Sequence, residues 1–289
     1  MKIKILIPIY NDWQSVFKLL ENINSEISGL EHEFSAIIVN DASTESRPEI
    51  NLNLNNLNSI KIINMKENRG HARCNAAGLK HIFENEEFDY VIPMDGDGED
   101  RPEEIKQLID NLNYHPDKPI VGERIKRSEG IFFKFCYFAH KIITSTFTGQ
   151  SIKYGNYTCL PKSIVEKMIN EKATWSSFSG ALAKITKDRA IIPSERGTRY
   201  FGPSKMSFKN LIIHSLSIIS VFRTNVLIRS ILFLLVYIFL IHQNITAIML
   251  IPVILVLTLI ASVFVVSKRE NLEELNESLL NISNIDNLK

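Results

Sequence analysis

Residues 90–97 read YVIPMDGD, an apolar run that ends in the carboxylates of Asp95 and Asp97. The run is typical of a buried strand, and side chains at positions i and i+2 of an extended segment point the same way. Paired hard oxygens suit Mg²⁺ or Mn²⁺, ions that take further ligands from water and from a diphosphate. The pair therefore predicts a metal site at the end of a strand. The alternative is an acidic turn that caps the following helix, where Pro102 is a good first-turn residue.

Upstream of this stretch, segments typical of strands and helices alternate. The expected strands cover residues 2–8, 34–39, 60–65 and 88–94. Helices with apolar residues at helical spacing are expected over residues 13–27 and 72–83. This alternation predicts an α/β fold with a mostly parallel sheet that helices cover on both faces.

Polar residues gather where each expected strand ends. They are Asn11 and Asp12 after the first strand, Asp41 after the second, Asn68, Arg69 and Gly70 after the third, and Asp95 and Asp97 after the fourth. In parallel sheets, ligands bind beyond the carboxyl ends of the strands. The four clusters therefore predict a single binding rim.

Several segments resemble the successive signatures of family 2 glycosyltransferases with the GT-A fold. In order they are PIYND (residues 8–12), VNDAS (39–43), ENRG (67–70) and DGDGEDRP (95–102). Two more, GNYTCL (155–160) and RGTRYFGPSKM (196–206), are similar to the polyprenyl-phosphate glycosyltransferase branch, which includes dolichyl-phosphate mannose synthase. The resemblance covers roughly residues 1–230. It implies a Rossmann-like GT-A catalytic domain, a nucleotide-sugar donor, Mg²⁺ or Mn²⁺, and inversion at the transferred sugar.

Three residues depart from the family pattern. Asn40 replaces the acid often found before Asp41, and Asn156 stands where many members of the branch carry Asp. Gly98 takes a position at which Leu-Gln commonly begins. Nucleotide-sugar binding stays the expectation, while the exact donor and the acceptor are left open.

The resemblance implies a donor-binding set at the predicted rim. Its members are Pro8, Tyr10, Asp12, Asp41, Arg69, Gly70, Asp95 and Asp97. Asp95 and Asp97 would hold the metal, which neutralises charge on the leaving diphosphate. Asp41 can accept hydrogen bonds from a base or a ribose, or it can form an Asx turn with Ser43.

Arg69 and Gly70 open a helix, so that backbone N–H groups and a guanidinium would face the diphosphate. A solvated Arg69 is the alternative. His71, beside the same helix start, has no assigned role.

The acceptor decides whether the site needs a general base. A sugar hydroxyl needs a carboxylate within hydrogen-bond reach, and Asp100 and Glu195 are the candidates. A lipid phosphate, with a second pKa near ~6, is largely dianionic at neutral pH and needs only cations to position it.

The cations that the chain offers are Arg124, Lys126, Arg127, Arg196, Arg199 and Lys205. Attraction to anionic lipids would explain the same basic residues. The expected catalytic residues are Asp97, Asp100, Arg124, Arg199 and Lys205.

The C-terminal third predicts a membrane anchor. Residues 226–241 are apolar apart from Arg229 and Ser230, and residues 245–266 are uncharged. A membrane span needs roughly 17–25 apolar residues. We therefore expect a transmembrane helical hairpin over residues 226–266.

The segments around the hairpin complete the predicted domain organisation. A GT-A catalytic domain is expected over residues 1–206, an interfacial amphipathic helix over 207–225, and a cytoplasmic tail with a short amphipathic helix over 267–289. An ordinary core helix is the alternative for residues 207–225. Residues 131–147 are either a membrane-facing lip of the acceptor site or a buried helix.

Charge predicts the orientation of the anchor. Lys and Arg residues flank the hairpin on both sides, which predicts a multi-pass protein of the cytoplasmic membrane with its catalytic domain in the cytoplasm.

Composition sets further limits. A chain of 289 residues with 45% hydrophobic content can build one catalytic core and a membrane anchor. The formal net charge of +1 excludes a strong overall electrostatic attraction to polyanions, so nucleic acid is not an expected partner. Three widely spaced cysteines show no metal-ligand pattern and fit a reducing cytoplasm. A homo-oligomer in the bilayer is left open.

These features predict a membrane-anchored, metal-dependent, inverting glycosyltransferase that transfers a sugar from a nucleoside diphosphate to a polyprenyl phosphate at the cytoplasmic leaflet. One alternative is an enzyme of the same fold that acts on a hydroxyl of a lipid-linked glycan or envelope polysaccharide. A second is a catalytically silent GT-A-like membrane scaffold, which the retention of both Asp95 and Asp97 disfavours.

Overall fold

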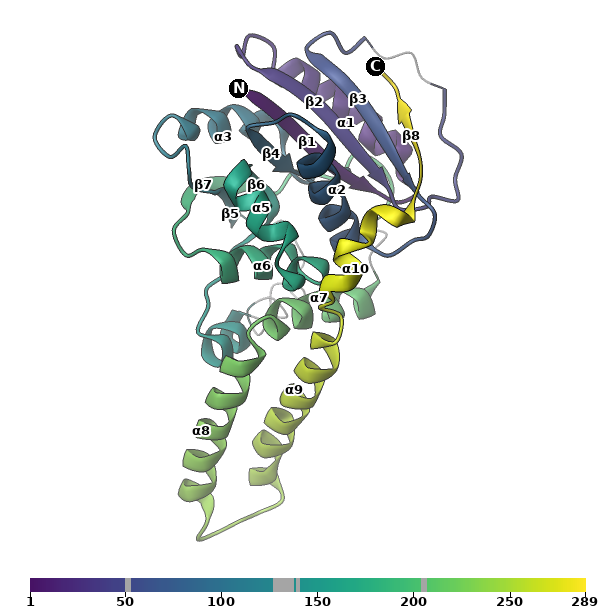
Figure 1. Ribbon diagram of the computed structural model, residues 1–289. Coiled ribbons are helices and arrows are strands. Elements are labelled where there is room, and N and C mark those ends of the chain that lie inside the picture. Colours follow the sequence, from purple (N-terminus) through teal and green to yellow (C-terminus); the bar gives the residue numbers. More distant parts are fainter. Residues whose placement is uncertain (50–52, 127–137, 139–140, 204–206) are drawn as a thin grey trace.

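The computed structural model describes residues 1–49, 53–126, 138, 141–203 and 207–289. Within these ranges, the chain forms an eight-stranded sheet with the order β7-β5-β6-β4-β1-β2-β3-β8 (Figure 1). The strands are β1 Lys2–Ile9, β2 Glu33–Asn40, β3 Leu57–Met65, β4 Tyr90–Pro93, β5 Ile120–Lys126, β6 Tyr154–Pro161, β7 Ala190–Glu195 and β8 Ile282–Asn287. Strands β4, β1, β2 and β3 run parallel, whereas β6 and β8 run antiparallel to their neighbours β4 and β3. This mostly parallel sheet confirms the predicted α/β fold class.

Helices cover both faces of the sheet. One face carries α1 (Trp13–Glu26) and α3 (Ile105–Leu112), and the other carries α2 (His71–Asn85), α5 (Lys162–Ile169) and α6 (Phe178–Ile185). In β1, Ile5 and Ile7 pack into the core that contains α1, whereas Leu6 packs into the core that contains α2. A strand buried on both faces needs a continuous apolar run, and residues 5–9 (ILIPI) are such a run.

The strand register brings the carboxyl ends of the central strands level with one another. Ile9 of β1 pairs with Asn40 of β2, and Asn40 pairs with Asn64 of β3. β4 ends at Pro93, and the chain that follows packs closely on β1. A Cβ atom built on Gly96 would lie only 2.9 Å from Ile9 Cγ2. The residues around Gly96 therefore lie at the predicted rim.

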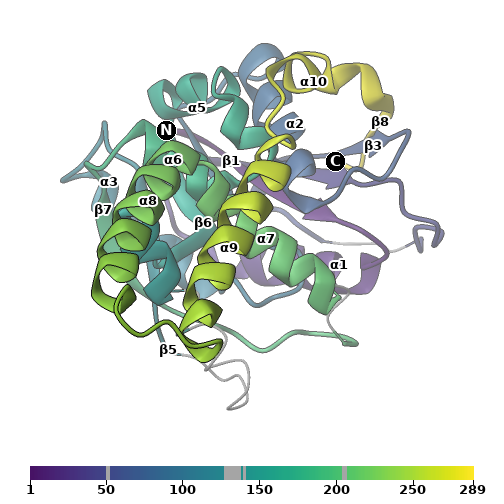
Figure 2. The ribbon, with the colours of Figure 1, turned by 90° about the horizontal axis from the view of Figure 1, so that it is seen from below.

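Two long apolar helices project from the sheet domain (Figure 1). They are α8 (Arg223–Ile241) and α9 (Ile251–Ser267), which pack against each other and are joined through the 3₁₀ turn η4 (Ile248–Leu250). α8 and the helical run Ile248–Asn276, which contains α9, are each long and apolar enough to cross a membrane, and most of the side chains of the two helices are exposed. α7 (Phe208–Ser220) packs at their base against α9, α8 and α6 (Figure 2).

The last segment, predicted as a tail over residues 267–289, returns to the sheet. It contains the expected short helix, α10 (Leu272–Asn276), followed by the 3₁₀ turn η5 (Ser278–Asn281) and by β8. β8 pairs with β3 and forms one edge of the sheet (Figure 1). Its sequence, ISNIDN, has no run of apolar residues, because an edge strand is held largely by backbone hydrogen bonds. The apolar hairpin is therefore inserted between two parts of one sheet.

Arg229, the charge inside α8, has a local partner. Its guanidinium donates to the carbonyl of Thr146 at 3.0 Å and lies over Gly149. Asn225 of the same helix donates to the carbonyl of Thr148 at 3.1 Å. These bonds hold the π-helical turn η2 (Thr144–Thr148) against α8. Residues 131–137 and 139–140 of the predicted lip lie outside the described residues.

Candidate active site

The two carboxylates after β4 face different partners. Asp95 Oδ1 lies 3.2 Å from His71 Nε2 and 3.3 Å from Asn156 Nδ2, and the same His71 nitrogen lies 2.6 Å from Asn156 Nδ2. Burial raises the pKa of Asp95, but His71, Arg124 and Asn156 together lower it by more, so the pKa lies well below its usual range. Burial lowers the pKa of His71, and the negative charges of Asp95, Asp100 and Asp97 raise it by more. His71, which had no predicted role, thus lies against both Asp95 and Asn156.

Asp97 is held by the segment that follows β7. Its Oδ2 accepts a hydrogen bond from Arg199 Nη1 at 2.5 Å, and its Oδ1 accepts one from the Glu99 N–H at 3.0 Å. The other terminal nitrogen of Arg199 pairs with Asp12. Burial and the charge of Asp95 raise the pKa of Asp97 to about 6, despite the opposing effects of the Glu99 N–H and Arg199. Asp12, Asp97 and Arg199, all predicted site residues, are therefore brought together.

Asp100 is buried and bonds back to the start of the turn that holds Asp95 and Asp97. Its side chain is 4% exposed, its Oδ2 accepts the Asp95 N–H at 2.9 Å, and its Oδ1 lies 3.3 Å from Arg124 Nη2. Burial and the charge of Asp95 raise the pKa of Asp100 to about 7. Asp100 and Arg124 are thus paired with each other at the predicted site.

Asp41 organises the loop that opens α2. Its two carboxylate oxygens accept the N–H groups of Arg69 and Gly70, each at 2.8 Å. These N–H groups, expected to face a diphosphate, are therefore engaged within the protein. In place of the alternative Asx turn from Asp41 to Ser43, the Ser43 N–H donates to Asn40 Oδ1 at 3.0 Å.

The loop after β1 is locked to the loop after β2. Asn11 adopts a positive φ of 50°, which Asn tolerates better than most residues. Its Oδ1 accepts the N–H groups of Thr44 and Glu45 at 2.8 and 3.1 Å. Tyr10 is 39% exposed beside this turn, whereas Pro8 is buried within β1. The Asn11 contacts were not predicted, because their partners come from a distant segment.

Residues 196–203 form a segment that we call the strap. It lies over residues 95–100, which we call the acidic turn. The N–H of Gly197 donates to the Glu99 carbonyl at 2.8 Å, and the N–H of Tyr200 donates to the Asp97 carbonyl at 2.9 Å. Arg196 pairs with Glu99. Two predicted cationic residues, Arg127 and Lys205, lie outside the described residues.

The two carboxylates can ligate a divalent ion that takes its other ligands from water and a substrate. Asp95 and Asp97 offer hard carboxylate oxygens, the ligands that Mg²⁺ and Mn²⁺ prefer in proteins. The described part of the chain has no group of three or more His, Cys, Asp or Glu residues arranged to hold a metal. The protein would therefore supply part of the coordination, as is usual for Mg²⁺ sites completed by water and phosphate.

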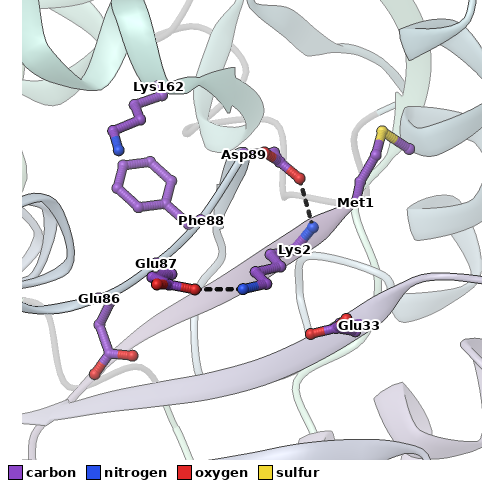
Figure 3. Close-up of a pocket in the computed structure, with 8 residues that line it drawn as sticks. All are labelled: Met1, Lys2, Glu33, Glu86, Glu87, Phe88, Asp89 and Lys162. Carbon is purple, nitrogen blue, oxygen red and sulfur yellow. Dashed lines mark hydrogen bonds and ion pairs between the residues drawn. The ribbon is translucent and has the colours of Figure 1, made fainter.

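A cavity of about 430 Å³ lies elsewhere, at the amino ends of the strands. Figure 3 shows Lys2 between Asp89 and Glu87 in this cavity, with Lys162 over the ring of Phe88. Ligands of parallel sheets bind at the opposite, carboxyl ends. We therefore assign the candidate active site to the rim around Asp95 and Asp97.

A mostly parallel sheet with paired carboxylates after a central strand is the arrangement that the resemblance to GT-A glycosyltransferases implies. Residues 4–164 match the family described as Glycosyl transferase family 2. The chain belongs to this family.

Two solved sugar-transfer enzymes share the fold, and a third structure is similar at a lower score. Glucosyl-3-phosphoglycerate synthase from Mycobacterium tuberculosis, in complex with Mn²⁺, UDP-glucose and phosphoglyceric acid, has a TM-score of 0.56 at 11% identity, over 78% of this chain and 79% of that one. Mannosyl-3-phosphoglycerate synthase from Rubrobacter xylanophilus has a TM-score of 0.55 at 10% identity, over 76% of this chain and 72% of that one. S. aureus TarS has a TM-score of 0.49 at 14% identity; the match covers 80% of this chain and 42% of TarS.

Proposed function

We propose that the protein is a membrane-anchored, inverting glycosyltransferase that transfers a sugar from a nucleoside diphosphate to a polyprenyl phosphate at the cytoplasmic leaflet. The observation that carries the proposal is the position of the strap. It contacts Asp97 through Arg199 and then leads into α7 and the apolar hairpin. Pro203 and Ser207 are four residues apart in sequence, so at most about 14 Å separates them. The acidic rim thus lies a short distance along the chain from the membrane helices.

The donor would bind at the rim. Asp95 and Asp97 would hold a divalent ion, which when bound supplies positive charge to the diphosphate and to the departing nucleoside diphosphate. Asp41 keeps the β3–α2 loop in place through the Arg69 and Gly70 N–H groups. The partly exposed Tyr10 would contact the nucleoside.

The state of Asp100 supports a phosphate acceptor over a hydroxyl. A hydroxyl acceptor needs a base within hydrogen-bond reach, but Asp100 is 4% exposed and both of its oxygens are engaged. Glu195, the other candidate, lies 3.7 Å from Arg101 in an ion pair. A phosphate dianion is itself the nucleophile and requires neither residue as a base.

The return of the chain to the sheet supports the membrane orientation. α8 follows the sheet domain and β8 rejoins it, so a spanning hairpin would have both of its ends on one side of the bilayer. Arg223, Lys268 and Arg269 lie at those ends. The positive-inside rule then predicts a cytoplasmic sheet domain.

The proposal is tested with detergent-solubilised protein, Mn²⁺, undecaprenyl phosphate and a panel of radiolabelled nucleotide sugars. We expect acid-labile label in the organic phase from at least one donor, lost in Asp97→Asn. Glu103→Gln, which removes a more exposed carboxylate from the 3₁₀ helix Pro102–Glu104 that follows, is the matched control and should retain transfer. Transfer of label to a hydroxyl-bearing glycan acceptor, with none to the lipid phosphate, would refute the assigned acceptor.

A further inference from the structure

The strap places a protein cation on the proposed metal ligands. Arg199 bridges Asp97 and Asp12, and the three side chains are 15%, 17% and 15% exposed. A guanidinium that donates to two carboxylates offsets much of their charge when it is shielded from water. In this arrangement, Arg199 occupies the space beside Asp97 in which a bound cation would otherwise supply positive charge.

The backbone and an aromatic ring hold the strap in this position. Gly98 has a φ of +90°, and a Cβ atom built on this glycine would lie 2.5 Å from the nearest ring atom of Tyr200. The ring therefore packs directly on the bare backbone of the acidic turn. Its hydroxyl accepts a hydrogen bond from Asn22 Nδ2 of α1 at 2.8 Å. These contacts, together with the two backbone bonds from Gly197 and Tyr200, align Arg199 with Asp97.

We infer that Arg199 is a tethered counter-cation that competes with the divalent ion for Asp97, and that metal binding releases the strap from the acidic turn. This inference rests on the proposed function for the role of Asp95 and Asp97 as metal ligands. A cation beside a carboxylate repels a second cation, so the ion and the Arg199 contact weaken each other by the same factor. The released guanidinium is then free to bind the donor diphosphate.

Direct binding of Mn²⁺ to the full-length, detergent-solubilised protein tests the inference without nucleotide. Free Mn²⁺ is followed by electron paramagnetic resonance for the wild type, Arg199→Gln and Arg101→Gln. Arg101 pairs with Glu103 and Glu195 and does not contact Asp95 or Asp97, so its replacement removes the same charge from the same region. We expect Arg199→Gln to bind Mn²⁺ roughly tenfold more tightly than the wild type, within the usual range of coupling between sites. Arg101→Gln should change the Kd by less than about twofold.

Release of the strap has its own readout. Trypsin cleaves after Arg196 and Arg199, and mass spectrometry reports each cleavage separately. In the wild type, saturating Mn²⁺ should increase cleavage at these two bonds. Tyr200→Phe, which removes only the hydroxyl that bonds to Asn22, should increase cleavage without Mn²⁺.

Each outcome has a distinct meaning. Unchanged or weaker Mn²⁺ binding by Arg199→Gln, with a melting temperature near that of the wild type, overturns the competition. Unchanged cleavage on addition of Mn²⁺ overturns the release of the strap. Absence of Mn²⁺ binding in the wild type and in every variant overturns both the inference and the assignment of Asp95 and Asp97 as metal ligands. The proposed transfer of sugar to a lipid phosphate is tested separately by the assay with radiolabelled donors.

Discussion

Replacement of Gly98 by Ala tests how the strap is packed. Gly98 and Gly29 both have positive φ angles, +90° and +84°, but nothing lies within 4 Å of a Cβ built on Gly29. An Ala at either position carries a backbone cost of about 1–2 kcal/mol. At Gly98 the new methyl group would also meet the Tyr200 ring at 2.5 Å.

The difference between the two variants isolates the ring contact. Displacing Tyr200 would break its bond to Asn22, worth about 0.5–1.5 kcal/mol, and would remove the packing of the ring. We therefore expect Gly98→Ala to lose about 2–4 kcal/mol and Gly29→Ala about 1–2 kcal/mol. At about 2–4 °C per kcal/mol, Gly98→Ala should melt several degrees below Gly29→Ala.

Two assays follow the change: thermal unfolding by intrinsic fluorescence, and tryptic cleavage after Arg196 and Arg199. Gly98→Ala should be cleaved faster at these bonds, and Gly29→Ala should match the wild type. Equal melting temperatures and equal cleavage of the two variants would refute the assigned packing of Tyr200 on Gly98.

Three further predictions concern the fold and the rim. Glu86 bonds to Lys4 at 2.9 Å and to Lys61 at 2.5 Å, so Glu86→Gln should cost about 2–3 kcal/mol at neutral pH in a denaturant titration. Burial raises the pKa of Glu86 and the bonds from Lys61 and Lys4 lower it by more, so this stabilisation is complete above the ordinary pKa of 4.5. It is lost progressively as the pH falls below 4.5 and through the lower folded pKa, so the gap between wild type and variant should narrow there; a gap that does not narrow below pH 4.5 would contradict the assignment. A chain that ends at Asn281 lacks β8 and should lose about 2–4 kcal/mol, measured by thermal unfolding, because the β3 edge is then unpaired; an unchanged melting temperature would argue against that edge. Asp95→Asn should weaken Mn²⁺ binding by at least about tenfold in the resonance titration, because a carboxylate ligand becomes a neutral amide; unchanged binding would exclude Asp95 as a ligand.

The sequence predicts the central strands and the rim because both depend on local patterns. β1 and β2 are buried on both faces and appear as apolar runs, and the polar residues that follow them lie at strand ends. The parallel register then brings Asp12, Asp41 and Asp97 to one edge without further information.

Contacts between distant segments were not predictable in the same way. Asp41 accepts hydrogen bonds from the backbone N–H groups of Arg69 and Gly70. Almost every residue has such a group, so the residue types do not reveal the partner. The strap reaches Asp97 through a sequence separation of about one hundred residues, and only the fold reveals that Tyr200 needs a glycine at position 98. β8 was missed because its pairing depends on the backbone and most of its side chains are exposed.

Arg229 illustrates how tertiary structure explains a charge in an apolar helix. A long charged side chain in an apolar helix is expected to reach toward the membrane interface. The structure gives it the Thr146 carbonyl as a partner, so that it secures η2 against α8. This contact connects the base of the apolar hairpin to the segment that leads into β6 and to Asn156, a neighbour of Asp95.

The most direct test of the central claim compares two acceptors of equal chain length, polyprenyl phosphate and polyprenol. Release of nucleoside diphosphate from the active donor is followed for the wild type and Asp97→Asn. We expect rapid release by the wild type with the lipid phosphate, background release with the polyprenol, and background release by Asp97→Asn with both. Equal release with the two lipids, or full activity of Asp97→Asn, would contradict a phosphate acceptor and a metal site at Asp97.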